Sequence, residues 1–201
     1  MASTTISPKD VSELRTRTGA GMMDCKRALE ESGGDMDKAA ELLRKKGIAK
    51  AEKRAGRVAS QGVVVSYLHH NGQVGSLVEL NCETDFVART DDFQQLARDI
   101  ALHVASADPI GVNPEDIPVE LLDRERRIAE EQVAQEGKPE NIRAKIVDGK
   151  IKKFVAERTL TEQPFVKDDK RTVGQLVKEA SGKLGEAISI RRFARFKIGE
   201  V

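Results

Sequence analysis

The sequence has few aromatic residues and only two cysteines. Phe, Trp and Tyr together make up 3% of the 201 residues, and Trp is absent, so any core must be mainly aliphatic. Cys25 and Cys82 lie far apart and belong to no paired motif, which argues against a disulfide framework or a thiolate metal site. We expect both to be small buried side chains in a reducing compartment.

A strong net charge and long apolar runs are also missing. The 34 Lys and Arg residues nearly balance the 33 Asp and Glu residues, so the chain has no general attraction for nucleic acid, and a protein partner is the better expectation. Apolar runs such as residues 62–65 are too short to cross a bilayer, and residues 1–6 lack the basic-then-apolar pattern of a signal peptide. These features predict a cytoplasmic protein that does not enter membranes.

No arrangement of residues suggests catalysis. His69 and His70 are adjacent in an expected strand, where they point to opposite faces and cannot chelate one ion. His103 lies on an expected helix, where a structural role is favoured. The Gly19-Ala20-Gly21 turn lacks the preceding strand and third glycine of a dinucleotide fingerprint, and no P-loop occurs. The sequence therefore predicts no enzyme, no metal site and no cofactor of its own.

Three short helices are predicted in residues 1–52. Ser7 can cap a first helix, Gly33-Gly34 ends a second, and Asp35 can cap a third. Gly47 is expected to close the third helix in the left-handed conformation. Apolar residues at helical spacing predict that these helices form one compact module, which we call the head.

Residues 53–61 are predicted to be a basic connector, since Lys and Arg occupy half of positions 44–57. Such a stretch is typical either of a solvated tether or of a helix that spans two modules. The same residues allow an alternative function, that of a ribosome- or RNA-associated adaptor, although aromatic stacking groups are missing.

From residue 62 the pattern changes from helical to alternating, which predicts a core over residues 62–201. Two alternating runs flank Asn71-Gly72, a strong hairpin signal in which both turn residues take positive φ. A protruding helical hairpin is predicted at about 119–158, and a last strand over residues 188–198 completes a three-stranded antiparallel sheet. The fold class is therefore α+β. The expected buried stripe of a helix against the sheet is Phe93, Leu96, Ala97, Ile100, Ala101 and Val104.

The segment NCETDFVAR, at Asn81 to Arg89, contains candidate contact residues where the second strand gives way to a helix. In one interpretation, Thr84 or Asp85 caps the helix while Phe86 and Val87 plug the end of the sheet. In the other, Phe86 is an exposed aromatic anchor that enters a pocket of a partner.

Met22 and Met23 present a similar choice between core and contact surface. Methionine at helical spacing usually belongs to the core, but two consecutive side chains cannot both face one small core. At least one of them can therefore offer an adaptable apolar contact to a partner.

Four motifs, in order along the chain, resemble the elongation factor Ts family. They are TGAGMMDCK from Thr18, KRAGR from Lys53, NCETDFVAR from Asn81, and QPFVKD from Gln163 followed by TVGQL from Thr172. Because the motifs extend over most of the chain with plausible spacing, chance similarity of a single motif does not explain them.

The resemblance implies a translation factor that binds elongation factor Tu, promotes release of its GDP and so allows GTP to bind, without bond chemistry. It implies a head of the ubiquitin-associated type that docks on the partner's G domain, with Met22 and Met23 at the contact positions. It implies no direct contact with nucleic acid.

The resemblance also assigns a role to the segment that follows the second strand. Thr84, Asp85, Phe86 and Val87 match the loop that disturbs the partner's magnesium site. In that family, Phe86 corresponds to a ring that inserts between helices of elongation factor Tu, so that the phosphate-cradling loop loses its geometry and GDP leaves. This implication favours the exposed-anchor interpretation of Phe86.

Longer members of the family resemble chains with a duplicated core and an additional C-terminal helical module, whereas this sequence has a single core and ends at Val201. We therefore expect a homodimer in which a second copy supplies the missing half. The helical hairpin, Val119 to Arg158, is one candidate contact surface.

Overall fold

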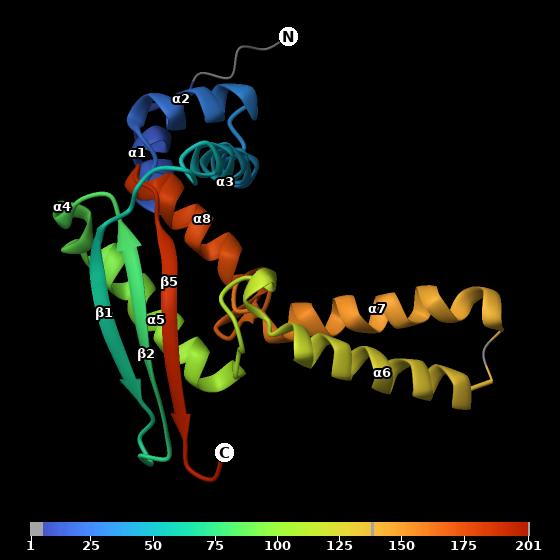
Figure 1. Ribbon diagram of the computed structural model, residues 1–201. Helices are drawn as coiled ribbons and strands as arrows, with labels where there is room; N and C mark the ends of the chain where they lie inside the picture. The colour runs from blue at the N-terminus through green and yellow to red at the C-terminus, as the bar shows by residue number, and fades with distance from the viewer. Residues whose placement is uncertain (1–5, 138, 201) are drawn as a thin grey trace. The chain divides into compact units, whose positions relative to one another are not determined.

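The computed structural model describes residues 6–137 and 139–200, which form helices and a small sheet in an α+β fold (Figure 1). Residues 1–5, Lys138 and Val201 lie outside the described part. The expectations for residues 1–5, for Val201 and for Lys138 between the two hairpin helices therefore stay predictions.

The described chain divides into two compact units. The first unit contains the residues up to Val63 together with Asn81–Leu96 and Gln175–Ser189, and the second contains Val64–Leu80, Ala97–Gly174 and the residues from Ile190 onward. Segments that lie far apart in the sequence thus meet within each unit.

Three helices pack together in the first unit: α1 (Pro8–Thr18), α2 (Met22–Glu31) and α3 (Met36–Glu52). Apolar residues spaced three and four apart place one face of each helix in a common cluster. The predicted helix starts are confirmed, because Ser7 caps α1 and Asp35 caps α3 through hydrogen bonds from backbone amides. The buried members of the cluster are Val11, Leu14, Cys25, Ala28, Leu29, Ala39 and Leu43.

Gly47 does not end α3, so the prediction of a C-cap at this residue is wrong. The helix continues to Glu52, and the basic stretch therefore begins as a helix rather than a tether. Gly47 instead lies against α8 (Val173–Leu184), where a Cβ added to Gly182 would meet its backbone at 2.8 Å. The two glycines let the helix backbones approach closely, a need that a single sequence does not distinguish from a helix end.

Gly182→Ala is expected to lower the free energy of unfolding by about 1–3 kcal/mol, although alanine favours the helical backbone by ~1 kcal/mol. The new methyl group has to displace the backbone of Gly47. Gly149→Ala is the matched control, since a Cβ at this helical position meets nothing within 4 Å. It should raise the free energy of unfolding by about 0.5–1 kcal/mol. Urea unfolding measures both changes, and equal effects of the two substitutions would contradict the close helix contact.

The predicted three-stranded sheet is confirmed, with β1 (Gln61–Leu68), β2 (Val74–Cys82) and β5 (Ser189–Lys197) in the order β1-β2-β5 and with neighbouring strands antiparallel (Figure 1). The hairpin between β1 and β2 is also confirmed, but its turn differs. Gly72 has a φ of 68°, whereas Asn71 is not among the described non-glycine residues with positive φ. The Asn71 side chain instead accepts a hydrogen bond from the amide of Gln73. β1 ends at Leu68 and β2 begins at Val74, so the connection is longer than a two-residue turn.

Helix α5 (Asp91–Ala107) lies against one face of the sheet. Within the second unit, the Ser76 hydroxyl donates to the carbonyl of Ala101 at 2.7 Å, and Arg195 Nε donates to the carbonyl of Ala105 at 3.1 Å. The six residues of the predicted stripe are all buried, which confirms the helix and its orientation.

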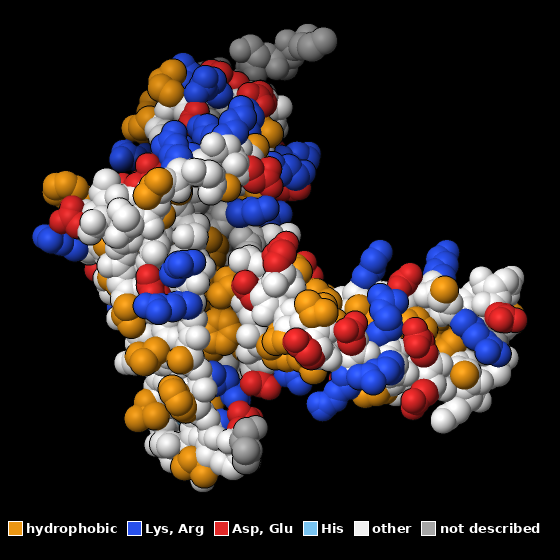
Figure 2. Space-filling model, in the orientation of Figure 1, with side chains coloured by type: hydrophobic (Ala, Val, Ile, Leu, Met, Phe, Trp, Pro, Cys, Tyr) orange, Lys and Arg blue, Asp and Glu red, His pale blue; other side chains and the backbone are white. Residues whose placement is uncertain are grey.

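The opposite face of the sheet carries apolar side chains that no described residue covers (Figure 2). Side chains on a strand alternate between faces, and in β1 and β2 these residues have the parity opposite to the more buried ones. In the second half of β5, exposed Phe196 alternates with the partly buried Phe193 and Arg195. We call this surface the outer sheet face. Its large exposed apolar residues are Val64, Leu68, Leu77, Phe196 and Ile198.

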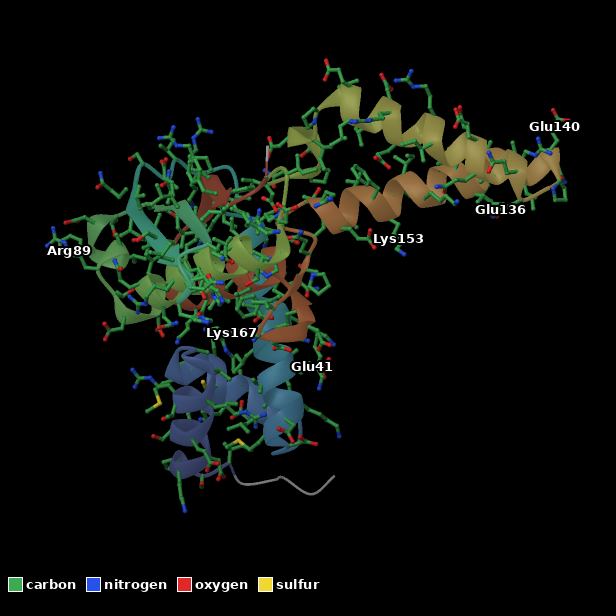
Figure 3. The ribbon with its side chains drawn as sticks, turned by 90° about the horizontal axis from the view of Figure 1, so that it is seen from below. Glu41, Arg89, Glu136, Glu140, Lys153 and Lys167 are labelled. Carbon is green, nitrogen blue, oxygen red and sulfur yellow. The ribbon has the colours of Figure 1, made fainter. Side chains whose placement is uncertain are left out.

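The predicted helical hairpin is confirmed as α6 (Val119–Gln135) and α7 (Glu140–Arg158), which run side by side in Figures 1 and 3. Its apolar core is small, with buried Ala129, Val133 and Val147. An ion pair of 2.9 Å between Arg126 and Asp148 also joins the two helices.

Two short elements of the second unit have no counterpart in the sequence prediction. A 3-10 helix covers Pro114–Asp116, and a two-stranded antiparallel sheet joins β3 (Pro164–Phe165) to β4 (Asp168–Thr172). Segments of this length are too short for a periodic apolar pattern to predict.

Candidate functional site

The segment after β2 forms a short helical turn, α4 (Asp85–Ala88). Thr84 precedes it with extended backbone, and its hydroxyl oxygen accepts a hydrogen bond from the amide of Val87 at 3.3 Å. The prediction that Thr84 or Asp85 caps this helix is confirmed for Thr84. The turn also bonds to the start of α5, because Gln94 donates to the carbonyl of Ala88 at 2.7 Å.

Phe86 points away from the core of the chain. Its side chain is 79% exposed, whereas Ala88, two residues further on, is buried. The interpretation in which Phe86 plugs the end of the sheet is therefore wrong. An ion pair of 3.0 Å between Asp85 and Arg89 joins the two ends of the turn, and Arg89 is labelled in Figure 3. An exposed aromatic ring on a capped and ion-paired turn has the geometry of a binding anchor.

Cys82, at the end of β2, is buried and free. Burial and then the nearby carboxylate of Glu186 raise the pKa of its thiol, so the group stays protonated. The Cys82 Sγ donates a hydrogen bond to the carbonyl of Thr84 at 3.1 Å. Cys25 is also buried and free, so the expectation of two small buried side chains is confirmed.

Met22 and Met23 begin α2, directly after Gly21. Their side chains are 49% and 64% exposed, so both lie at the surface although Met22 continues the helical spacing of the core. Next to them, the carboxylate of Asp24 accepts hydrogen bonds from Lys50 and Arg27, which hold its pKa below the usual value. This surface therefore combines two flexible thioether side chains with an aspartate whose charge is balanced by Lys50 and Arg27. Flexible thioethers of this kind can adapt to the surface of a partner.

The head helices and the turn of Phe86 belong to the same compact unit. Helix α8 joins them, through an ion pair of 3.0 Å between Lys178 and Glu52 on α3 and one of 2.8 Å between Lys183 and Asp92 near the turn. The two candidate contact surfaces are therefore carried by one body, although some sixty residues separate them in the sequence.

The basic connector does not form an unpaired cationic strip. Arg57 pairs with Glu83 at 3.4 Å, and Arg54 donates a hydrogen bond to the carbonyl of Ser181 at 3.5 Å. Upstream, Lys46 pairs with Glu31 at 2.8 Å. These contacts hold the chain together, and no observation favours the alternative of an RNA-associated adaptor.

His103 has the structural role that its helix position predicts, and it is almost completely buried. The amide of Val166 donates to its Nδ1 at 3.2 Å, so the proton resides on Nε2, which donates to the Gln163 side chain at 3.0 Å. Gln163 in turn donates to the carbonyls of Ala107 and Glu157. The QPFVKD motif is thus a hydrogen-bonding centre of the second unit. Burial lowers the pKa of His103, and the bond to Gln163 opposes this only in part.

Lowering the pH is expected to destabilise the chain through His103. Its folded-state pKa lies below the ordinary value of about 6.5, so the unfolded chain takes up a proton first and stability falls as the pH drops through 6.5. Urea unfolding between pH 7 and pH 5 measures the slope. His103→Gln should flatten this slope, and a slope that the substitution leaves unchanged would contradict the assignment.

The prediction that His69 and His70 point to opposite faces is wrong. β1 ends at Leu68, so both residues lie in the turn, and their ring centroids are 4.1 Å apart. His69 Nδ1 also lies 3.0 Å from the hydroxyl of Tyr67. Strand alternation does not apply outside the strand.

Among residues 6–137 and 139–200, no group of three or more His, Cys, Asp or Glu side chains could hold a metal ion. None of the helices in this part of the chain is long and apolar enough to span a membrane.

The fold and site have the features of a protein-binding class, in which large apolar side chains are exposed on one compact unit. The model of the Elongation factor TS family matches residues 28–200. The chain belongs to this family, whose members are translation elongation factors.

Individual relatives agree with this membership. The elongation factor Ts of Desulfosudis oleivorans is 55% identical over 196 residues, which make up 98% of this chain and 99% of the relative. That of Syntrophomonas wolfei is 55% identical over 195 residues, covering 97% of this chain and 91% of the relative. That of Thermosipho melanesiensis is 53% identical over 195 residues, covering 97% and 100%.

Proposed function

We propose that the chain binds elongation factor Tu in its GDP form and drives GDP out, so that GTP can bind. The ring of Phe86 enters the partner near its magnesium and phosphate site, and Thr84, Asp85 and Val87 form the rest of the inserted loop. The observation that carries this proposal is the 79% exposure of Phe86 on a capped turn. The chain supplies no bond chemistry, only binding energy.

The size of the ring supports this role. Burying a phenylalanine removes about 150–250 Å² from water, which at ~25 cal/mol per Å² corresponds to roughly 4–6 kcal/mol gross. By linkage, the factor by which the chain weakens GDP binding equals the factor by which GDP weakens binding of the chain. Since each ~1.4 kcal/mol is tenfold, one ring that is buried only in the nucleotide-free complex can weaken GDP binding several hundredfold.

The head supplies affinity for the partner. In this proposal residues 1–52 are a module of the ubiquitin-associated type that docks on the partner's G domain through Met22 and Met23, both exposed on α2. Residues 53–61 connect it to the core over residues 62–201, which includes the helical hairpin. The protein acts in the cytoplasm, where its partner serves translation.

The release of a fluorescent GDP analogue from elongation factor Tu tests the proposed function. The chain should accelerate release strongly and in proportion to its concentration until the partner is saturated. Release at the spontaneous rate at every concentration of the chain would rule the function out.

We also propose that the chain is a homodimer. We favour the outer sheet face over the helical hairpin as the contact surface. Its large apolar residues lie on all three strands and, for Ile198, directly after β5, and monomeric proteins rarely expose large apolar patches. Glu79 and Arg192 form an ion pair of 2.7 Å on the same face. Since the chain is nearly neutral, two copies do not repel one another strongly.

A further inference from the structure

The turn that carries Phe86 needs support from outside itself. Helix α4 spans only Asp85–Ala88, and a single helical turn has little stability of its own because its nucleation is unfavourable. Phe86 does not stabilise the turn by burying its ring, since most of its side chain is exposed. The support must therefore come from contacts to the residues that precede the turn.

Glu186, which follows α8, supplies these contacts. Its Oε2 accepts hydrogen bonds from the amides of Glu83 and Thr84, each at 3.0 Å. Its Oε1 accepts a third bond, of 2.6 Å, from the Thr84 hydroxyl. A carboxylate that accepts three bonds forms charge-assisted hydrogen bonds, which are shorter and stronger than neutral ones.

The contact is reciprocal. The carboxylate of Glu83 accepts a hydrogen bond of 2.7 Å from the amide of Ala187, the residue after Glu186. This bond is the main cause that holds the pKa of Glu83 below its usual value, and Arg57 of the connector adds to it. Two segments about one hundred residues apart in the sequence therefore hold each other through two carboxylates.

The segment of Glu186 is itself anchored. The Ser181 hydroxyl near the end of α8 donates a hydrogen bond to the backbone carbonyl of Glu186, and the Ser181 carbonyl accepts one from Arg54. Glu186 is thus tied to α8 and the connector on one side and to Thr84 on the other. All of these residues belong to the first unit.

We propose that Glu186 is a positioning residue for nucleotide exchange, which orders the turn so that Phe86 enters the partner already in its binding conformation. The inference rests on the proposed function and adds a residue to it. Ordering the turn before binding lowers the conformational entropy lost in the complex, and binding energy of the ring is then available to displace GDP.

Glu186→Ala tests this role in the full chain. The maximal rate of fluorescent-GDP release at a saturating concentration of the chain should fall about tenfold, because the three charge-assisted bonds that order the turn are lost. The concentration that gives half the maximal rate should change little, because the head surface of Met22 and Met23 is untouched. Glu186→Gln keeps one acceptor oxygen and should restore part of the rate.

Glu41→Ala is the matched control. This glutamate belongs to the same unit and pairs only along its own helix α3, with Lys45 at 2.7 Å among the described ion pairs. It should leave the maximal rate unchanged. Thermal unfolding of each variant separates loss of the fold from loss of positioning, and Glu186→Gln serves the same test if the alanine variant does not fold.

A double substitution separates positioning from a general structural role. In a Phe86→Ala background the turn has no ring to position, so Glu186→Ala should cause no further loss of rate. An equal loss in both backgrounds, or a wild-type rate for folded Glu186→Ala, would overturn the inference. An unchanged rate for Phe86→Ala alone would instead overturn the proposed function of the ring, so the two failures are distinguishable.

Discussion

Phe86→Ala is expected to slow chain-stimulated release of GDP from elongation factor Tu by roughly two to three orders of magnitude. The substitution removes the ring that the proposal buries only in the nucleotide-free complex. Since Phe86 is 79% exposed, it should leave the free energy of unfolding almost unchanged. Release of a fluorescent GDP analogue gives the rate, and urea unfolding gives the stability.

Val58→Ala is the control for this substitution. Val58 is 82% exposed and lies in the same unit, so the variant also loses an exposed apolar side chain. Its rate should equal that of the wild-type chain. If both variants slow release to the same extent, or if neither does, Phe86 has no specific role in exchange.

Phe196→Asp is expected to raise the dissociation constant of the homodimer at least about a hundredfold. Phe196 is 71% exposed at the outer sheet face, and in a two-fold symmetric dimer each substitution occurs twice in the interface. The interface then loses two apolar rings and has to desolvate two carboxylates. Analytical ultracentrifugation over a range of concentrations measures the change.

Ile142→Asp distinguishes the two candidate surfaces of the dimer. Ile142 is 40% exposed on the helical hairpin, and the same charge is introduced there. The dimer should persist in this variant. Dissociation of Ile142→Asp together with an intact Phe196→Asp dimer would transfer the interface to the hairpin, and a wild-type monomer at micromolar concentration would remove the dimer altogether.

The elements that the sequence predicts well are those whose signals are local. Ser7 and Asp35 cap helices because a short polar side chain reaches amides two or three residues away. The apolar stripe of α5 repeats over many residues, and its burial follows from its period. The bounds of the helical hairpin likewise follow from local breaks in the pattern.

The residues that the sequence does not reveal act over long distances. Glu186 bonds to Thr84 across 102 positions, and nothing near Glu186 in the sequence indicates that its carboxylate accepts three bonds. A glycine such as Gly47 looks the same in the sequence whether it ends a helix or allows the backbone of a second helix to approach closely. Only the fold places Gly182 beside it, so the local interpretation of Gly47 was wrong.

For the candidate contact residues, the sequence alone determines neither their burial nor their partner. Residue type alone left open whether Phe86 is buried, and the structure decides this by placing it on an exposed turn. What the ring binds was suggested by the resemblance to a family, because no local pattern encodes a partner's pocket.

The most direct test of the central claim is a comparison of affinities. We would measure the dissociation constants of the wild-type chain and of Phe86→Ala for elongation factor Tu, each in saturating GDP and without nucleotide. Because the ring is buried only after GDP leaves, the substitution should weaken binding to the nucleotide-free partner by roughly two to three orders of magnitude and change binding to the GDP form little. Equal weakening of both complexes would show that Phe86 is an ordinary anchor and does not couple binding to the loss of GDP.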